Sequence, residues 1–224
     1  MILSVLSPKG GCGKSTSALT LASVFADNKE LSIAIVDADP RQSIARVWQS
    51  KRTESKLLDS PFDIISDFSE STILDTLDEA REKYDLVIVD LEGVAGLMAS
   101  YAAAASDMCL VPMRPSALDG DAAGSALKMI RDAGRTARRE IPAKILITQT
   151  DAAIMTTSYR ELIKELDAAG IPRLQTELIR RAAYERMIAE GKTLFELDKT
   201  KAVLGAIANA ALLGQEIADI LEAE

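Results

Sequence analysis

The sequence has no histidine, two cysteines and few aromatic side chains among its 224 residues. The lack of histidine excludes Ser–His–Asp triads, zinc sites that use histidine, and acid–base catalysis by an imidazole. Cys12 and Cys109 are too few for a disulfide framework, which favours a reducing, cytoplasmic location. No apolar run approaches the roughly 18–20 residues of a membrane span, and no basic region precedes the first apolar run. We therefore expect neither a membrane anchor nor a signal peptide.

The net charge of −8 is distributed unevenly along the chain. Residues 1–127 carry 11 basic and 19 acidic groups, whereas residues 128–201 carry 15 basic and 11 acidic groups. The last 23 residues carry four acidic groups and no basic one. An acidic protein with a basic segment is able to bind nucleic acid. Charged, solvated helix faces would give the same composition, so charge alone leaves both interpretations open.

Short apolar segments alternate with segments of helical periodicity over the whole length. This alternation predicts an α/β fold, a doubly wound and mostly parallel sheet flanked by helices, in one domain over residues 1–224. The expected strands are 2–6, 31–36, 62–65, 86–89, 108–111, 144–148 and 174–179, with Pro112 ending the fifth. The expected helices are 18–25, 42–51, 71–84, 101–105, 119–134, 158–169, 182–190 and 199–221.

A glycine-rich segment, KGGCGKST from Lys9 to Thr16, lies between the first expected strand and the first expected helix. Glycine allows the backbone to curl around an anion with φ values that a Cβ disfavours. The amides and the helix N-terminus then face a phosphate, Lys14 adds a positive charge, and Ser15 offers a hydroxyl to Mg²⁺. Relative to the pattern G-x-x-x-x-G-K-[ST], Pro8 replaces the first glycine and Lys9 is an additional cation. The alternative for Lys9 is an exposed loop lysine.

Carboxylates follow two of the expected strands. Asp90 comes directly after strand 86–89, and Asp37 and Asp39 come at the end of strand 31–36. The carboxyl ends of parallel strands meet at one edge, so these groups are expected near the phosphate loop, where Asp90 would hold Mg²⁺ through water. Asp37 and Asp39 alternate in an extended segment, so we expect only one to face the phosphates. Glu92 either assists the metal or the attacking water, or caps a loop.

Four segments resemble the ParA/MinD family of ATPases with a deviant Walker A motif. KGGCGKST resembles the deviant Walker A motif, and DADPRQS resembles the second motif and switch I of the family. LVIVDLEG resembles its Walker B strand, and LVPMRPSALD resembles its strand followed by a proline loop. The resemblance covers Met1 to about Leu197 and is closest to small plasmid partition ATPases and to VirC-type proteins of conjugative DNA transfer. The family usually has a proline-containing turn after Asp90, whereas this chain has Leu91-Glu92-Gly93.

The resemblance implies roles for the residues of the loop and of the strand ends. Two monomers would enclose two ATP–Mg²⁺, with Lys9 of each reaching the phosphates held by the other. Lys14 would bind the β- and γ-phosphates, Ser15 would ligate Mg²⁺, and Thr16 would contact the α-phosphate. Asp39 would place the attacking water, and Asp90 would hold the waters of the metal. The expected catalytic residues are Lys9, Lys14 and Asp39, and the expected nucleotide-binding residues are Lys9, Gly10, Gly11, Cys12, Gly13, Lys14, Ser15 and Thr16.

The resemblance also implies a function. ATP would dimerise the protein, the dimer would bind DNA non-specifically, and a ParB-type or other adaptor protein would stimulate hydrolysis to ADP and phosphate. The expected location is the cytoplasm, associated with the nucleoid when ATP is bound, and the expected outcome is partition of a plasmid or chromosome. Two alternatives are an ATPase that positions conjugative DNA or a protein cargo, and a P-loop ligase of the dethiobiotin synthetase type. The acidic residues at the end of the sequence, unlike a basic amphipathic tail, argue against membrane binding.

DNA binding is expected to use the basic segment. Few aromatic residues accompany its arginines, so contact with phosphates is favoured over base stacking. The expected DNA contacts are Arg135, Arg138, Arg139, Arg180, Arg181 and Arg186.

Overall fold

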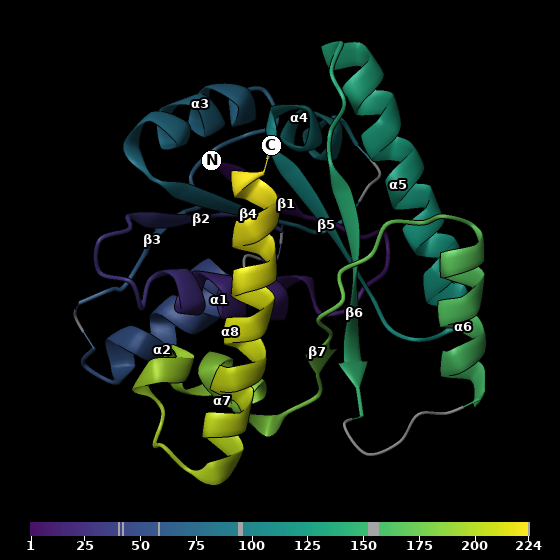
Figure 1. The fold of residues 1–224 in the computed structure, drawn as a ribbon. Helices are drawn as coiled ribbons and strands as arrows, with labels where there is room; N and C mark the ends of the chain where they lie inside the picture. The colour runs from purple at the N-terminus through teal and green to yellow at the C-terminus, as the bar shows by residue number, and fades with distance from the viewer. Residues whose placement is uncertain (40, 42, 58, 94–95, 152–156, 224) are drawn as a thin grey trace.

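A computed structural model shows seven parallel strands in the order β3-β2-β4-β1-β5-β6-β7 (Figure 1). It describes residues 1–39, 41, 43–57, 59–93, 96–151 and 157–223. The strands are β1 Ile2–Val5, β2 Ile33–Ala38, β3 Asp63–Ile65, β4 Leu86–Leu91, β5 Met108–Met113, β6 Ala143–Thr150 and β7 Leu178–Ile179. The doubly wound parallel sheet predicted from the sequence is confirmed.

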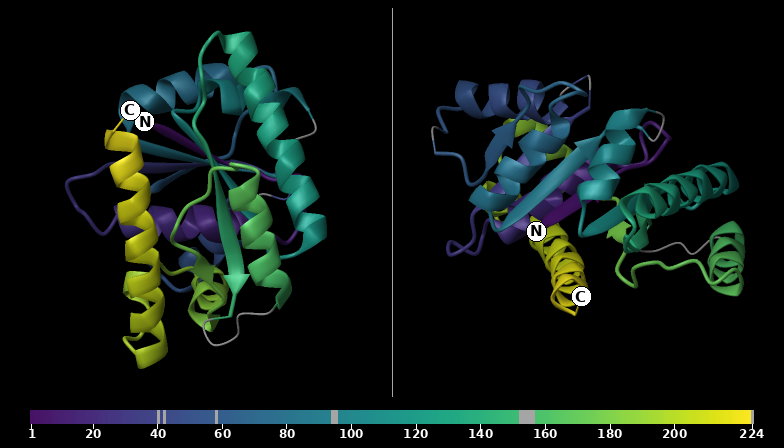
Figure 2. Two further views of the ribbon diagram at one scale, coloured as in Figure 1. Left: turned by 45° about the vertical axis from the view of Figure 1, so that its right-hand side comes forward. Right: turned by 90° about the horizontal axis from the view of Figure 1, so that it is seen from above.

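Helices cover both faces of the sheet (Figure 2). One core cluster joins one face to α1, α7 and α8, and the other joins the opposite face to α3, α4, α5 and α6. The helices are α1 Lys14–Phe25, α2 Gln49–Glu54, α3 Ile73–Lys83, α4 Leu97–Ala105, α5 Ala117–Ala137, α6 Thr157–Ala168, α7 Ala182–Glu190 and α8 Lys201–Glu222, with a π-helical turn η1 Ser43–Trp48 and a 3₁₀ turn η2 Leu194–Glu196.

The central strands are apolar at consecutive positions because both of their faces are covered. In β1, Leu3 and Val5 belong to the cluster beneath α1 and α8, whereas Ile2 belongs to the opposite cluster. All four residues of β1 and all six of β2 and β4 are buried. The arrangement fixes the carboxyl ends of β1, β2 and β4 at one edge of the sheet.

The prediction that Pro112 ends its strand is wrong, because β5 continues to Met113. The backbone N–H of Cys109 donates to Pro142 on the β6 side, and the carbonyl of Leu110 accepts from Leu6 on the β1 side. Since the backbone groups of successive residues in a strand point alternately to the two neighbouring strands, the nitrogen of Pro112 faces β1. The ladder between β1 and β5 has ended by that point, so the N–H that proline lacks has no partner to lose.

Most other elements differ from the predicted ranges by a few residues, and two differ more. The last strand was expected over 174–179 but consists of Leu178–Ile179, with a separate bridge between Ile145 and Arg173. The helix expected over 42–51 is η1 followed by α2, and residue 42 lies outside the described residues. Trp48 in η1 is fully buried, and its indole N–H donates to Lys192 O at 3.1 Å. The segment after β2 is thereby tied to the chain that follows α7.

Among the described residues, α8 is the one helix long and apolar enough by length and composition to cross a membrane. The sequence prediction considered uninterrupted apolar runs, which is a different criterion, so the expected absence of a membrane anchor stays a prediction. One face of α8, including Ala206, Ala210, Leu213 and Ile217, is buried in the core cluster that contains α1. Figure 1 shows α8 in yellow, lying along one face of the sheet.

Gly191 and Gly170 form a matched pair for testing how closely α7 packs. Both have a left-handed backbone, with φ of +64° and +63°. A Cβ on Gly191 would lie 2.2 Å from the backbone nitrogen of Arg52, whereas a Cβ on Gly170 would have no atom within 4 Å. We predict that Gly170→Ala lowers the free energy of unfolding by about 1 kcal/mol through φ strain, and that Gly191→Ala lowers it by roughly 3 kcal/mol or more through added overpacking. Urea denaturation of both variants checks this, and equal losses would contradict it.

Candidate nucleotide site

The turn between β1 and α1 has the backbone shape of an anion cradle. Gly11 and Gly13 have φ of 73° and 98°, values that favour glycine, and α1 begins directly after them at Lys14. Strand β6 supports the turn from one side. The Thr148 hydroxyl donates to Cys12 O at 2.7 Å, and the Gln149 side-chain amide donates to Gly11 O at 2.8 Å. Sequence reasoning missed Thr148 and Gln149 because they lie more than 130 positions away in the chain.

A cleft of about 720 Å³ opens in front of this turn. Its walls come from the turn, from the ends of β2 and β4, from the start of α4 and from Gln149. Its lining residues include Gly10, Gly11, Gly13, Lys14, Ser15, Thr16, Asp39, Arg41, Glu70, Glu92 and Gln149. Most residues expected from the sequence to hold a nucleotide therefore line one cleft. The exceptions are Lys9, Cys12 and Asp90, which are not in its wall; Cys12 is buried and its thiol donates to Lys9 O.

Lys14 places a positive charge inside the turn. Its side-chain nitrogen donates to Lys9 O at 3.1 Å, and the residue is only 7% exposed. The turn amides, the amino end of α1 and this ammonium group all favour negative charge at the same place. The site is thus suited to a phosphate chain.

Asp90 lies behind Ser15 and is fully buried. Burial raises the pKa of Asp90 to about 7; the Ser15 hydroxyl opposes the shift, and the nearby charges of Asp37 and Asp39 add to it. Neither carboxylate oxygen receives a hydrogen bond of good geometry. A buried, unsatisfied carboxylate beside the hydroxyl of Ser15 fits a hydrated cation. No group of three or more Asp, Glu, Cys or His in the described part of the chain could hold a metal alone, so phosphate and water oxygens would complete the shell.

Asp37 and Asp39 face different surroundings, but alternation along a strand is not the reason, because residues two apart in a strand share a face. The two differ because β2 ends at Ala38 and Asp39 lies beyond it. Asp37 is turned inward and accepts hydrogen bonds from the N–H groups of Ile44 and Ala45 at 3.1 and 2.8 Å, at the start of η1. Burial raises the pKa of Asp37, and these N–H groups oppose the shift. Asp39 lines the cleft and accepts from Arg41 N at 2.8 Å. Of the two carboxylates, Asp39 is therefore the one that lines the cleft.

Lys9 points away from its own turn and toward α5. Its ammonium nitrogen lies 2.6 Å from Asp119 Oδ1, and Asp119 is 1% exposed. Arg114 holds the other oxygen of Asp119 at 2.8 Å. Although burial raises it, the hydrogen bonds from Arg114 and Lys9 hold the pKa of Asp119 at about 2. Sequence reasoning missed Asp119, although it lies in the proline-loop segment that carried the family resemblance.

The six arginines expected to contact DNA fall into two separate sets. Arg135, Arg138 and Arg139 lie at the carboxyl end of α5, next to the amino end of β6. Arg180 lies at the opposite edge, where its N–H donates to Thr150 O just after Gln149. Arg181 and Arg186 begin and continue α7. Within the described residues, three of the six side chains have a hydrogen-bond or ion-pair partner: Arg135 with Asp132, Arg186 with Glu190, and Arg139 with the carbonyls of Ala104 and Ser106.

Known proteins share both the sequence and the fold of this chain. The sequence model of the VirC1 protein family matches residues 1–223. Protein ParA of Rhizobium radiobacter is 31% identical over 217 residues, which are 96% of this chain and 95% of that protein. Maintenance of carboxysome distribution protein A of Halothiobacillus neapolitanus is 29% identical, covering 87% of each chain. A variant of Cyanothece McdA solved in complex with ATP has the same fold, with a TM-score of 0.78 at 13% identity, covering 97% of this chain and 96% of that one.

The raised pKa of Asp90 predicts how stability depends on pH in the absence of nucleotide and metal. Between its ordinary value of about 3.9 and about 7, the folded protein holds a proton that the unfolded chain has released. The free energy of unfolding from this group therefore falls as pH rises toward 7 and is level above it. We predict that Asp90→Asn is more stable than the parent at pH 8, by on the order of a few kcal/mol, and that the gain shrinks toward pH 5. Denaturation in EDTA at both pH values tests this.

The exposed Asp27→Asn is the matched control for the removed charge. It is expected to leave the pH profile of the parent unchanged. An Asp90→Asn variant that is less stable than the parent at pH 8 would contradict the prediction.

Proposed function

The chain belongs to the VirC1 family of ParA/MinD-type proteins, and from that premise we propose that it is an ATPase that dimerises around ATP and Mg²⁺. In the dimeric state it binds DNA non-specifically and moves or partitions a DNA molecule, and hydrolysis to ADP and phosphate ends the state. The observation that carries the proposal is the direction of the Lys9 side chain, which pairs with Asp119 of α5 and is not among the residues that line the cleft of its own subunit.

The cleft fits ATP and Mg²⁺ by the chemistry of its lining. The turn amides and Lys14 would bind the β- and γ-phosphates, Thr16 the α-phosphate, and Ser15 with Asp90 the metal and its waters. Bound Mg²⁺ would neutralise the charge that builds on the transferred phosphoryl group. Asp39 is the carboxylate in the cleft wall that would orient a water. Because such transfer depends mainly on positioning and charge, a cation supplied by a second subunit would increase the rate strongly.

Dimerisation is supported by two exposed leucines, one beside the ion-pair partner of Lys9 and one between Gly96 and Met98 of the cleft lining. Leu118, next to Asp119, is 74% exposed, and Leu97 at the start of α4 is 56% exposed. Large apolar side chains at the rim of a polar cleft favour contact with another protein surface. We propose that a second subunit covers these leucines and that Lys9 then exchanges Asp119 for the phosphates held by the partner.

DNA contact is proposed at the edge that carries Arg180. Arg180 is exposed, and the guanidinium of Arg181 lies so close to α8 that a Cβ on Gly205 would be 3.1 Å from its Nη1. The exposed Lys201 lies one turn before Gly205 and so on the same side of α8. Arg180, Arg181 and Lys201 form a basic patch at the edge that holds the nucleotide cleft. Nucleotide-dependent dimerisation would therefore bring two such patches into one assembly, in the cytoplasm and on the nucleoid.

A second candidate function is positioning of conjugative DNA or a protein cargo. It is supported by the match to the VirC1 family and by the 29% identity with a carboxysome distribution protein. In both candidates an adaptor protein, of ParB type or another, would stimulate turnover. Retention on DNA distinguishes DNA partition from positioning of a protein cargo, because an ATPase with only minor DNA contact would be retained weakly. A ligase of the dethiobiotin synthetase type would instead consume ATP only with a small-molecule substrate.

The role of Lys9 is tested by comparing Lys9→Ala with Lys14→Ala. We predict that Lys9→Ala binds ATP with little change in affinity but loses ATP-dependent dimerisation and roughly 10²–10³-fold in turnover, since one phosphate-stabilising cation is removed. Lys14→Ala is expected to weaken nucleotide binding itself. Light scattering and phosphate release measure the two effects. Unchanged turnover in Lys9→Ala would contradict the shared site.

DNA binding is tested by retention on a non-specific duplex with ATP and with ADP. Retention is expected with ATP only, decreasing as salt increases, because Lys and Arg release counterions from phosphates. Arg180→Ala with Lys201→Ala is predicted to lower the slope of log K against log salt by roughly one for each cation removed from a phosphate. Lys29→Ala with Lys56→Ala, on exposed lysines elsewhere, is the control for removed charge. Equal retention with ADP and ATP, or none at any salt, would contradict the DNA-switch proposal.

A further inference from the structure

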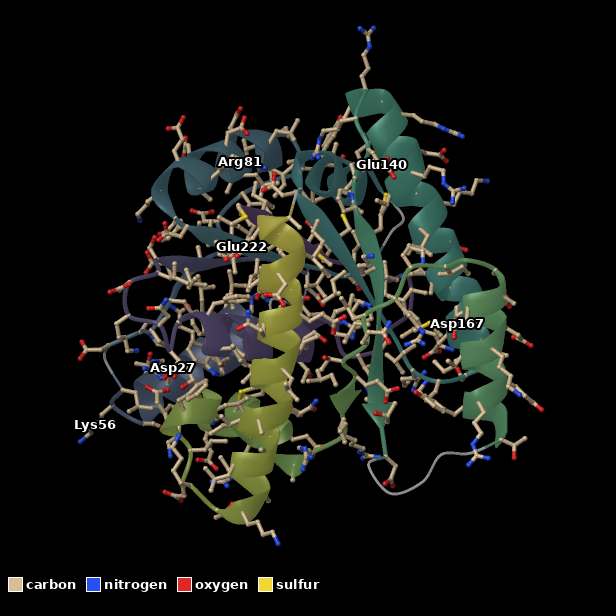
Figure 3. All side chains as sticks on the ribbon, viewed as in Figure 1. Asp27, Lys56, Arg81, Glu140, Asp167 and Glu222 are labelled. Atoms are coloured by element: carbon tan, nitrogen blue, oxygen red, sulfur yellow. The ribbon has the colours of Figure 1, made fainter. Side chains whose placement is uncertain are left out.

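A second groove, of about 1020 Å³, lies at the end of the molecule opposite the phosphate loop. The carboxyl-terminal half of α5, the amino end of β6 and the connection from α6 to β7 form its walls. In Figure 1 these segments meet at the upper right, and Figure 3 labels Glu140 there beside α5. None of the residues assigned to the nucleotide cleft lines this groove.

The groove has an aliphatic floor. Leu127, Pro142 and Ile171 are half-buried, and beneath them Ile130 and Ile141 are part of the core. No aromatic residue lies among the lining residues. The half-buried side chains leave apolar surface in contact with water, and a ligand that covered it would gain the free energy of burial.

The rim of the groove is strongly cationic in a protein of net charge −8. Five basic residues line it, Arg131, Arg135, Arg138, Arg139 and Lys144, with Glu140 as the one carboxylate among the lining residues. Arg135 and Arg139 are already engaged, with Asp132 and with backbone carbonyls. Arg131, Arg138 and Lys144 have no side-chain hydrogen bond or ion pair within the described part of the chain. The helix dipole stabilises cations at the carboxyl end of α5. It does not explain why Lys144 lies at the same rim, because Lys144 is in β6.

An apolar floor between unpaired cations determines what kind of ligand fits. Nucleic acid would use the cations but not the aliphatic floor, and there is no ring among the lining residues on which a base could stack. An amphipathic helix with aliphatic residues on one face and flanking carboxylates would use both. We propose that this groove is a docking site for an acidic, amphipathic segment of a partner protein. Such a partner would be held at the end of the subunit away from ATP and from the patch of Arg180, Arg181 and Lys201.

The probe is an 18-residue amphipathic peptide with leucines at helical spacing and glutamates on the other face. Two companion peptides carry glutamine in place of glutamate and serine in place of leucine. Fluorescence anisotropy measures their affinities, and amide chemical shifts of the labelled protein locate the site. The acidic leucine peptide is expected to bind at least about tenfold more tightly than either companion, because each lacks one of the two interactions. Shifts are expected at Gly134, Ala143 and Gly170, which line the groove.

Charge reversal tests the rim. Arg131→Glu with Lys144→Glu, two lining residues that are not among the expected DNA contacts, is predicted to weaken binding of the acidic peptide at least about tenfold while ATP turnover and DNA retention stay as in the parent. The matched control is Arg160→Glu with Lys164→Glu, the same change in charge on exposed residues of α6. Melting temperatures and ATP binding verify that both variants fold.

Three results would overturn the proposal. They are no binding of the acidic peptide, equal binding of the glutamine peptide, and equal weakening by the α6 control. If the Arg131 and Lys144 variant instead loses DNA retention and keeps peptide binding, the groove is a nucleic-acid site. Loss of ATP-dependent dimerisation would contradict the function proposed above and not this groove, because the peptide is measured without nucleotide.

Discussion

The register of three parallel strands is the constraint on which the nucleotide cleft depends. Asp90 in β4 lies level with Val5 in β1 and with Asp37 in β2. Strands in register are about 4.8 Å apart and direct equivalent side chains to the same face, so two carboxylates are buried side by side where the phosphate loop begins. Burial raises the pKa of both, and the charge of Asp37 raises that of Asp90 further. Such a pair opposes folding when both groups are ionised, and a divalent cation is the kind of ligand that would relieve it.

The sequence predicted well what depends on local pattern. Consecutive apolar residues identified the buried strands, and KGGCGKST identified the turn, since its backbone favours glycine. Alternation was the wrong reason for expecting Asp37 and Asp39 to face different ways, because residues two apart in a strand share a face; they differ because β2 ends at Ala38, before Asp39. What it missed depends on chain segments that meet only in the fold: Thr148 and Gln149 against the turn, and Asp119 against Lys9. Pro112 was misjudged because its cost depends on whether a neighbouring strand needs its N–H, which no local pattern shows.

Lys9 and Asp119 connect the cleft to the rest of the subunit. Asp119 lies in the first turn of α5, a helix of 21 residues that ends beside the cationic groove. Its charge is held by Arg114 as well as by Lys9, so the aspartate keeps a partner when the lysine leaves. Breaking a buried pair is costly mainly when a charge is left uncompensated. The second cation therefore lowers the free-energy cost of moving Lys9 to another subunit.

Three surfaces of the molecule lie apart: the cleft rim with Lys9, the patch of Arg180, Arg181 and Lys201, and the groove at the far end of α5. The leucines at the cleft rim and Lys9 lie where a second subunit would come, and Arg180 with Arg181 and Lys201 lie at that edge of the sheet beside β7. The groove at the far end of α5 uses neither. If the protein changes partners with its nucleotide state, as proposed, it gains from this arrangement, because a partner bound at the far groove would block neither the proposed dimer contact nor the proposed DNA contact. Its effect on turnover would have to pass along α5 to Asp119, whose ion pair with Lys9 is the element able to take two positions.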